Sequence, residues 1–163
     1  MKTRAILALG GNLGDRAKTI EEAIEVIDRH PEISVKGKSD LYESHALTLA
    51  GTNEAEPNYL NGVIAISTSL KPKKLLEFLN QVESDFGRVR LERWAARTLD
   101  IDIITYGTEL IETKSLIIPH PRAHERGFVL VPWAQLDPEA ILPGQGKVAE
   151  LAQGFQASVW RFE

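Results

Sequence analysis

Cysteine is absent from this chain of 163 residues, and methionine occurs once. Without cysteine the chain can form no disulfide, no thiolate metal site and no cysteine nucleophile, so a reducing compartment is natural. Long apolar runs are also missing. The run near the N-terminus covers only residues 5–9, which is too short for a signal-peptide core and far from the roughly 20 residues that a membrane span needs. The sequence therefore predicts a cytoplasmic protein with no membrane partner.

An excess of positive charge is lacking as well. The 19 lysine and arginine residues are outnumbered by 23 aspartate and glutamate residues, which gives a formal net charge of −4. This balance disfavours a general nucleic-acid binder but still allows a local basic site for a small anion. The chain has no repeat, low-complexity tract or linker, and 43% of its residues are hydrophobic. We therefore expect a single domain over residues 1–163 with a sizeable core.

Hydrophobic periodicity predicts alternating strands and helices. The expected order is a strand at 3–9, a glycine-rich turn at 10–14, a helix ending at Pro31, a strand near 33–43, a long loop at 44–57, a strand at 59–68, a helix from Pro72 to Gly87, and a strand at 98–106. The resulting β-α-β-β-α-β order indicates an α+β fold, with two helices packed on an antiparallel sheet as a two-layer sandwich.

The glycines after the first strand do not form a known nucleotide-binding motif. Gly10, Gly11 and Gly14 miss the G-x-G-x-x-G spacing, and no Lys-Ser/Thr pair follows them as in a Walker loop. Two interpretations stay open: a tight turn from strand to helix, or a close approach of the backbone to a ligand.

Two aspartates alternate with apolar residues in the last predicted strand. Residues i and i+2 of a strand point to one face about 6 to 7 Å apart, so Asp100 and Asp102 share a face while Leu99, Ile101 and Ile103 point into the core. Two carboxylates this close repel each other unless a cation neutralises them, and oxygen ligands favour Mg²⁺ or Mn²⁺. The alternative is an ordinary polar strand face.

Arginines gather just before this strand. Arg88, Arg90, Arg93 and Arg97 fall within ten residues that contain a single acid, Glu92. Guanidinium groups bind phosphate oxygens, and a hard divalent cation can bind the same phosphates from the other side. The pattern indicates polyphosphate chemistry, although a solvated loop is the alternative. Trp94, within the same stretch, favours a site because an indole can stack on a flat ring.

Further polar positions are candidates for ligand contact. Glu83 lies at the edge of the apolar stripe of its helix. Tyr59 and Asn61 share a strand face, where they either complete a hydrogen-bonded strand end or meet the edge of a heterocycle. His120, between two prolines, either bridges backbone groups or donates to a phosphate, and Arg126 is close to it in the sequence.

Several blocks together resemble the 6-hydroxymethyl-7,8-dihydropterin pyrophosphokinases of folate biosynthesis. The most specific block is Arg93-Trp94-Ala95-Ala96-Arg97-Thr98-Leu99-Asp100-Ile101-Asp102-Ile103, and the others are A-L-G-G-N-L near the N-terminus, Tyr59-Leu60-Asn61, Gly87-Arg88-Val89-Arg90, Pro119-His120 and Arg126-Gly127-Phe128. The order and spacing of these blocks match over nearly the whole chain. The chain departs from the family's usual pattern at Ser44-His45-Ala46-Leu47-Thr48, at Ala95-Ala96, and at Ser115 and Ile117.

The resemblance implies a ferredoxin-like fold with C-terminal additions, and transfer of pyrophosphate from ATP to the pterin's hydroxymethyl oxygen with release of AMP. We favour a monomer, which neither the residues nor their spacing determines. It implies catalytic roles for Arg90, Arg93, Arg97, Asp100 and Asp102, with two Mg²⁺ ions on the two aspartates. The implied pterin contacts are Ser44, His45, Leu47, Tyr59, Asn61, Trp94 and Phe128. The implied nucleotide contacts are Glu83, Arg90, Arg93, Trp94, Arg97, Ile103, His120 and Arg126.

The mechanism we expect is in-line attack of the pterin hydroxyl on the β-phosphorus of ATP, with Mg²⁺ and arginines stabilising charge and no nucleophilic side chain. Two alternatives stay open: a Mg²⁺-dependent nucleotide phosphohydrolase in which water replaces the pterin, and a non-catalytic module that binds RNA or another anion through the arginines.

Overall fold

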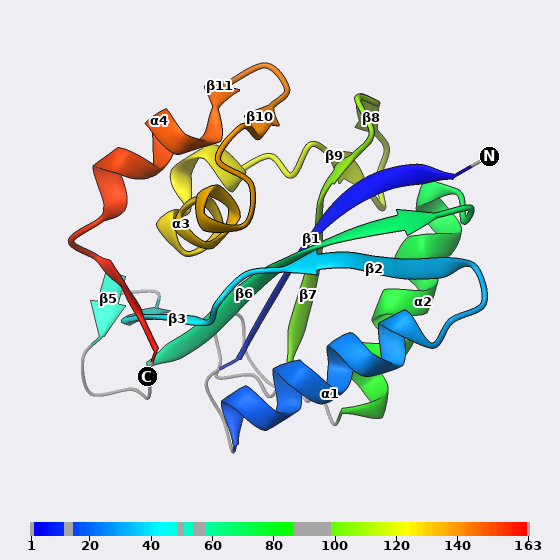
Figure 1. The fold of residues 1–163 in the computed structure, drawn as a ribbon, viewed down its shortest axis with the longest axis horizontal. Coiled ribbons are helices and arrows are strands. Elements are labelled where there is room, and N and C mark those ends of the chain that lie inside the picture. Colours follow the sequence, from blue (N-terminus) through cyan, green and yellow to red (C-terminus); the bar gives the residue numbers. More distant parts are fainter. Residues whose placement is uncertain (1, 12–14, 49–50, 54–57, 87–98, 163) are drawn as a thin grey trace.

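The computed structural model describes residues 2–11, 15–48, 51–53, 58–86 and 99–162 (Figure 1). Its main sheet has the strand order β12-β3-β6-β1-β7, and β2 also pairs with β6. All of these pairs are antiparallel. The strands are β1 (Thr3–Gly11), β2 (Ile33–Lys38), β3 (Tyr42–Ser44), β6 (Tyr59–Thr68), β7 (Asp100–Tyr106) and β12 (Val159–Arg161). The prediction of a mixed α and β fold with an antiparallel sheet is confirmed.

Helices α1 (Arg16–Asp28) and α2 (Pro72–Asp85) form where the periodicity predicts them. The side chain of Asp15 accepts a hydrogen bond from the Lys18 N–H and caps α1. In α2, Pro72 occupies the first turn, where its missing N–H costs nothing. Each helix turns one apolar stripe toward the sheet, as an amphipathic helix does at a core.

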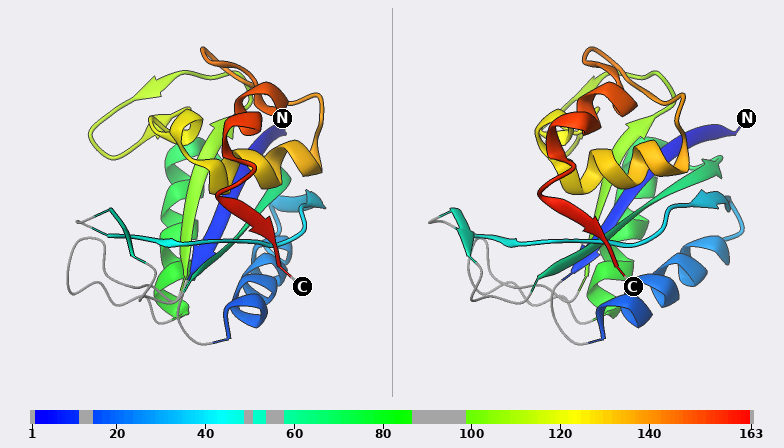
Figure 2. Two further views of the ribbon diagram at one scale, coloured as in Figure 1. Left: turned by 90° about the vertical axis from the view of Figure 1, so that its left-hand side faces the viewer. Right: turned by 60° about the vertical axis from the view of Figure 1, so that its left-hand side comes forward.

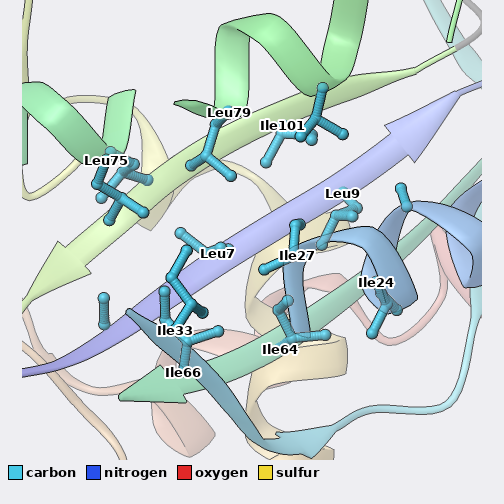
Figure 3. Packing of buried hydrophobic residues seen from close by; sticks show 14 of the residues in the cluster. Leu7, Leu9, Ile24, Ile27, Ile33, Ile64, Ile66, Leu75, Leu79 and Ile101 are labelled. Atoms are coloured by element: carbon cyan, nitrogen blue, oxygen red, sulfur yellow. The ribbon is translucent and has the colours of Figure 1, made fainter. Parts of the chain in front are cut away.

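These two helices and the sheet enclose the larger hydrophobic core. Leu7 and Leu9 of β1 lie between the two helices and are fully buried (Figure 3). Ile27 of α1 and Leu79 of α2 pack over them, and Ile101 of β7 extends the layer. Burying a side chain of this size contributes about 1.5 to 3 kcal/mol, so this layer is a principal source of stability.

The C-terminal third of the chain covers the opposite face of the sheet. Helix α3 (Gly127–Leu136) lies there, on the side away from α1 and α2 (Figure 1). Its residues Leu130 and Trp133 pack with Val63 and Ile104 in a second buried cluster. Strand β12 runs beside β3 at the sheet edge (Figure 2). The predicted C-terminal additions therefore make a third layer over part of the sheet.

Short elements complete the described fold. They are β4 (Ala46–Thr48) paired with β5 (Gly51–Asn53), β8 (Ile111–Glu112) paired with β9 (Ile117–Ile118), β10 (Ile141–Leu142) paired with β11 (Gly146–Lys147), the helix α4 (Val148–Ala152), and 3₁₀ turns at Ala123–Glu125 and Gln153–Phe155.

Three local predictions are wrong. The strand predicted over 33–43 is broken between β2 and β3, because the Ser39 hydroxyl accepts the Val63 N–H at 2.9 Å and the Ser39 N–H donates to the Val63 carbonyl at 2.8 Å. The loop predicted over 44–57 contains the hairpin β4–β5. Gly10 and Gly11 belong to β1 rather than to a turn, because their backbones pair with β6.

Candidate functional site

One row of residues crosses four neighbouring strands on the face that α3 only partly covers. Tyr42 of β3 pairs with Asn61 of β6, Asn61 pairs with Gly10 of β1, and Gly10 pairs with Asp100 of β7. In the adjacent row, Ala8 pairs with Asp102. Side chains of paired residues point to the same face, so the register brings Asn61 and the two aspartates onto one surface.

The two aspartates lie as the sequence predicts. Asp100 and Asp102 are half-buried, and between them Ile101 is buried in the core on the other face, as is Ile103. Because Ile103 points into the core, a contact between this residue and a nucleotide would use its backbone. The alternation of β7 therefore separates an apolar face from a carboxylate face.

Gly10 keeps the surface between Asn61 and Asp100 free of side chains. A Cβ atom at this position would collide with Oδ1 of Asn61 and would lie 3.3 Å from the carbonyl oxygen of Leu60. Two strand spacings of about 4.8 Å separate Asn61 from Asp100, which leaves a flat strip of backbone at Gly10. Of the two interpretations left open for the glycines, close approach to the backbone therefore fits Gly10 better than a turn.

Asn61 has an unused hydrogen-bond donor. The residue is buried, and its Nδ2 has no hydrogen-bond partner in the described part of the chain. Leaving a buried donor unsatisfied costs about 1 to 3 kcal/mol. An acceptor on a bound ligand would remove this cost. On the same strand face, Tyr59 is half-buried and pairs with Ser44 of β3.

Arg126 connects the start of α3 to the aspartates. Its Nη1 lies 3.8 Å from Oδ2 of Asp102, and its guanidinium carbon lies 5.7 Å from the centre of the Phe128 ring. A guanidinium over an aromatic face is an attractive arrangement. The fold thus brings Asp102, Arg126 and Phe128 together, although α3 follows β7 by twenty residues or so in the sequence.

His120 is held in one orientation by two backbone hydrogen bonds. The backbone N–H of His120 donates to the Ile104 carbonyl at 2.9 Å, and the ring Nδ1 accepts the backbone N–H of Arg122 at 3.2 Å. Burial, together with the charges of Arg126 and Arg122, lowers its pKa to about 4, and the charge of Asp100 opposes this shift. Since Nδ1 is an acceptor, the proton of the neutral ring is on Nε2. His120 can therefore donate a hydrogen bond without carrying a charge at neutral pH.

Glu83 is buried to a greater extent than its place at the edge of the stripe predicts. The residue is 3% exposed, and its Oε2 accepts a hydrogen bond of 2.6 Å from the N–H of Ile101. Its partner lies on β7 between the two aspartates. The sequence marks this acid as unusual but does not indicate its partner, because 18 residues separate the two.

The remaining predicted residues differ in burial and in whether the structure describes them. Ser44 is buried in β3, and His45 is exposed with its ring 5.1 Å from that of Trp160 of β12. Trp160 had no sequence signal. Leu47 belongs to β4, but its side chain is outside the described structure. Arg88, Arg90, Arg93, Trp94 and Arg97 all lie outside the described residues, and their roles stay predictions.

The carboxylate pair fits a metal ion that is bound together with phosphate. In the described ranges no group of three or more His, Cys, Asp or Glu side chains could hold a metal on its own. Mg²⁺ usually binds one or two carboxylates and completes its shell with substrate phosphates and water. Asp100 and Asp102 meet that requirement, and both carry oxygen ligands on one face.

Comparisons with known proteins agree with this picture. The family model described as 7,8-dihydro-6-hydroxymethylpterin-pyrophosphokinase (HPPK) matches residues 6–138. A curated relative from Bacillus subtilis, named 2-amino-4-hydroxy-6-hydroxymethyldihydropteridine pyrophosphokinase, is 40% identical over 83% of this chain and 79% of its own length. A relative of the same name from Haemophilus influenzae is 38% identical over 93% of this chain and 92% of its own.

Solved structures show the same fold at low identity. A crystal structure of Plasmodium falciparum HPPK-DHPS with pteroate superposes with a TM-score of 0.75 at 13% identity. The match covers 96% of this chain, which spans less than half of that one, at 43%. At this identity the likeness concerns the fold alone.

The matching family model and the curated relatives define an enzyme that transfers phosphate groups. The chain belongs to the 7,8-dihydro-6-hydroxymethylpterin-pyrophosphokinase family. It is an ATP-dependent diphosphotransferase that moves pyrophosphate from ATP to hydroxymethyldihydropterin in folate biosynthesis. Among the described residues, no helix has the length and apolar character needed to cross a bilayer.

Proposed function

We propose that pyrophosphoryl transfer takes place on the sheet face made by Asn61, Gly10 and Asp100, with the pterin on the Asn61 side and the triphosphate on the aspartate side. The observation that carries this assignment is the backbone strip at Gly10, which has an unsatisfied amide donor beside it and the carboxylate pair on its far side. A planar heterocycle needs a flat surface and polar edge partners, and both are available there.

The pterin contacts follow from this placement. Asn61 Nδ2 donates to an acceptor on the ring edge, and Tyr59 and Ser44 line the same face through the pairing of β6 with β3. Phe128 stacks on the ring, with Arg126 beside it. His45, Leu47 and Trp94 complete the proposed set. The unsatisfied donor of Asn61 is the strongest support, because ligand binding would give it a partner.

Asp100 and Asp102 would hold two Mg²⁺ ions together with the phosphates of ATP. When bound, the ions neutralise phosphate charge and make the phosphorus more susceptible to attack. Arg126, whose guanidinium faces Asp102 in the free protein, is free to turn to the phosphates once that carboxylate binds a metal. The side chain would then exchange one anionic partner for another of higher charge.

The nucleotide is bound by a mixture of charged and neutral groups. Arg90, Arg93, Arg97 and Arg126 supply charge, and Trp94 lies near them in the sequence. His120 donates through Nε2–H as a neutral ring. Ile103 offers backbone groups at the edge of β7, and Glu83 is the last proposed contact. A neutral donor adds direction to the site without adding a charge that the metal ions would repel.

The reaction is an in-line displacement. The hydroxymethyl oxygen of the pterin forms a bond to the β-phosphorus, and the bond from that phosphorus to the oxygen bridging the α- and β-phosphates breaks, so AMP leaves. The hydroxyl proton goes to solvent or to a phosphate oxygen. The protein contributes by holding both substrates in line and by stabilising charge, so that no side chain forms a covalent intermediate.

We also propose that the fold is ferredoxin-like and that the protein works as a cytoplasmic monomer. The order β1-α1-β2-β6-α2-β7, with β1 between β6 and β7 and with β2 beside β6, supports the first part. Light scattering at catalytic concentration measures the oligomeric state directly.

Product analysis tests the proposed reaction. Incubation of the protein with ATP, Mg²⁺ and 6-hydroxymethyl-7,8-dihydropterin should yield AMP in step with the pterin consumed. ADP as the main product would contradict pyrophosphoryl transfer. A control without pterin distinguishes the phosphohydrolase alternative, which would release phosphate or pyrophosphate at an unchanged rate.

A further inference from the structure

Strand β7 is the last strand of the sheet, with β1 as its neighbour on one side. A peptide nitrogen carries a single hydrogen, and that of Ile101 is donated to Glu83 Oε2. The outer edge of β7 is therefore bound by a side chain of α2 at the one residue that separates Asp100 from Asp102. Further along the strand, the His120 N–H binds the Ile104 carbonyl at 2.9 Å.

Packing alone does not account for an acid at position 83. Its helix neighbours in the buried stripe are Leu79 and Val82, both apolar, and burying a carboxylate is unfavourable unless strong hydrogen bonds compensate for it. A hydrogen bond of 2.6 Å to a carboxylate is short and assisted by charge. The acid is placed where an otherwise unpaired edge amide needs an acceptor.

The location of this hydrogen bond gives it influence over both aspartates. β7 begins at Asp100, so Ile101 lies one residue inside the strand end, where fraying starts. Rotation of the peptide unit between Asp100 and Ile101, or of the next one, would change the separation and direction of the two carboxylates. Fixing the Ile101 N–H directly opposes the first of these rotations.

We propose that Glu83 is a positioning residue that holds the β7 backbone so that Asp100 and Asp102 keep the geometry needed to bind metal with the nucleotide. This rests on the proposed function in one respect, the assignment of the two aspartates as metal ligands. It differs from the prediction that Glu83 contacts the nucleotide, since the action of Glu83 here is on the protein and is present before any ligand binds. Groups that orient metal ligands typically change metal affinity about 10-fold to 100-fold when they are removed.

Three variants of α2 test the proposal. Glu83→Leu keeps a side chain of similar size and removes the acceptor, and Glu83→Gln keeps an acceptor oxygen. Gln81→Ala, on the exposed side of the same helix, is the matched control, because the Gln81 side chain is exposed and donates its hydrogen bond to Asp85 of the same helix. The first measurement is the amide exchange rate and amide proton shift of Ile101 by NMR, without metal or nucleotide. The second is Mn²⁺ affinity in the presence of a non-hydrolysable ATP analogue, by electron paramagnetic resonance.

We expect Glu83→Leu to speed Ile101 amide exchange at least about 10-fold and to weaken Mn²⁺ binding by about 10-fold to 100-fold. Glu83→Gln should restore most of both values, and Gln81→Ala should leave both at the parent level. Should Glu83→Leu fail to fold, the upfield shift of the Ile101 amide proton in Glu83→Gln, together with a smaller loss of Mn²⁺ affinity, supports the proposal. No shift and no loss in Glu83→Gln would then overturn it.

Two other results also overturn the proposal. Faster Ile101 exchange with unchanged Mn²⁺ affinity would show that the hydrogen bond serves stability alone. Weaker nucleotide binding with unchanged Ile101 exchange would show that Glu83 acts on the nucleotide alone and does not position β7. Failure of the proposed function gives a separate result, because the parent protein would then form no AMP while the metal-free NMR comparison would be unaffected.

Discussion

The two faces of strand β1 differ in what they contribute, although they are built from alternate residues of one segment. Leu7 and Leu9 point toward α1 and α2 and are fully buried in the larger core. Ala8 and Gly10 point to the other face, where Asp102 and Asp100 are their neighbours. Because the side-chain period of a strand is two residues, one face can be optimised for packing while the next residue along serves the ligand.

The site face is itself divided. Under α3 it is apolar, with Val63 and Ile104 in the second buried cluster. Beyond α3 the same strands carry Asn61 and Asp100. The larger core holds the strands in register, and the uncovered end carries half-buried charges and an unsatisfied amide. We therefore expect substitutions on the two faces to separate stability from activity.

The largest effect is expected at the carboxylates. Changing either Asp100 or Asp102 to Ala removes a proposed metal ligand and should lower turnover roughly a hundredfold or more. The melting temperature of the metal-free protein should change little, because the relief of like-charge repulsion offsets the loss of interactions such as the ion pair of Asp102 with Arg126. Steady-state kinetics, calorimetric titration of Mg-ATP and thermal melts measure the three quantities.

The exposed acid Glu109, in the turn after β7, offers a matched control. Glu109→Ala should leave turnover and Mg-ATP affinity unchanged. Turnover at the parent level in both aspartate variants would remove the metal site from the mechanism. A fall in melting temperature that accompanies the loss of activity would show that the aspartates hold the fold.

The reverse separation is expected on the packing face. Leu75→Ala deletes a fully buried side chain of α2 and should lower the free energy of unfolding by about 2 to 5 kcal/mol. The kcat at a temperature where the variant is folded should change by less than about twofold, because Leu75 does not reach the site face. Urea denaturation and low-temperature kinetics measure both, with exposed Lys73→Ala as control. A large fall in kcat would contradict the separation of the two faces.

How well the sequence predicts a feature of the site depends on how local that feature is along the chain. The sharing of a face by Asp100 and Asp102 depends only on strand alternation, and the structure confirms it. The role of Gly10 depends on its pairing with Asn61, more than fifty residues away. The sequence alone therefore did not decide between a tight turn and a backbone strip that a ligand can approach. Glu83 was recognisable as misplaced, but its hydrogen bond to Ile101 required the packing of α2 on β7.

The strand break near residue 39 has a similar cause. Residues 33–43 are apolar near both ends, at Ile33, Val35, Leu41 and Tyr42, and polar between them. The position of the break is set by one hydroxyl that competes for the Val63 N–H. Side chains of Ser, Thr, Asn and Asp provide such local alternatives to the ladder, and their use depends on the partner strand. Periodicity locates such a strand without identifying the residue at which it divides.

A smaller, ligand-specific effect is expected at Asn61. Asn61→Ala should raise the pterin KM by an amount equivalent to about 1 to 3 kcal/mol, because ring-edge groups lose a partner, while the KM for ATP changes little. The free protein should lose little stability, since the substitution also deletes a buried donor that has no partner in the described part of the chain. Separate titrations of the two substrates measure the difference, with exposed Asn80→Ala as the control. A defect mainly toward ATP would show that the pterin and nucleotide sides were assigned the wrong way round.

The smallest effect concerns the pH dependence of folding stability, to which His120 on the site face contributes. The folded-state pKa of about 4 is below the ordinary value of 6.5, so between these values the unfolded chain binds more protons than the folded one. Stability contributed by the neutral ring is therefore full above about pH 6.5 and is lost as the pH falls toward 4. Because the ring is partly exposed, solvent reduces this loss to about 1 kcal/mol.

Urea denaturation of the metal-free protein between pH 4 and pH 7 measures this loss, with His120→Asn as the comparison. Asn keeps a polar side chain that can accept the Arg122 N–H but does not titrate, so the slope of stability against pH should be shallower in the variant than in the parent over this window. Above pH 7 the two slopes should coincide, since the ring is neutral in both the folded and the unfolded chain. Equal slopes at low pH would show that folding does not lower the pKa of His120, which would contradict a ring that the protein keeps uncharged for donation to phosphate.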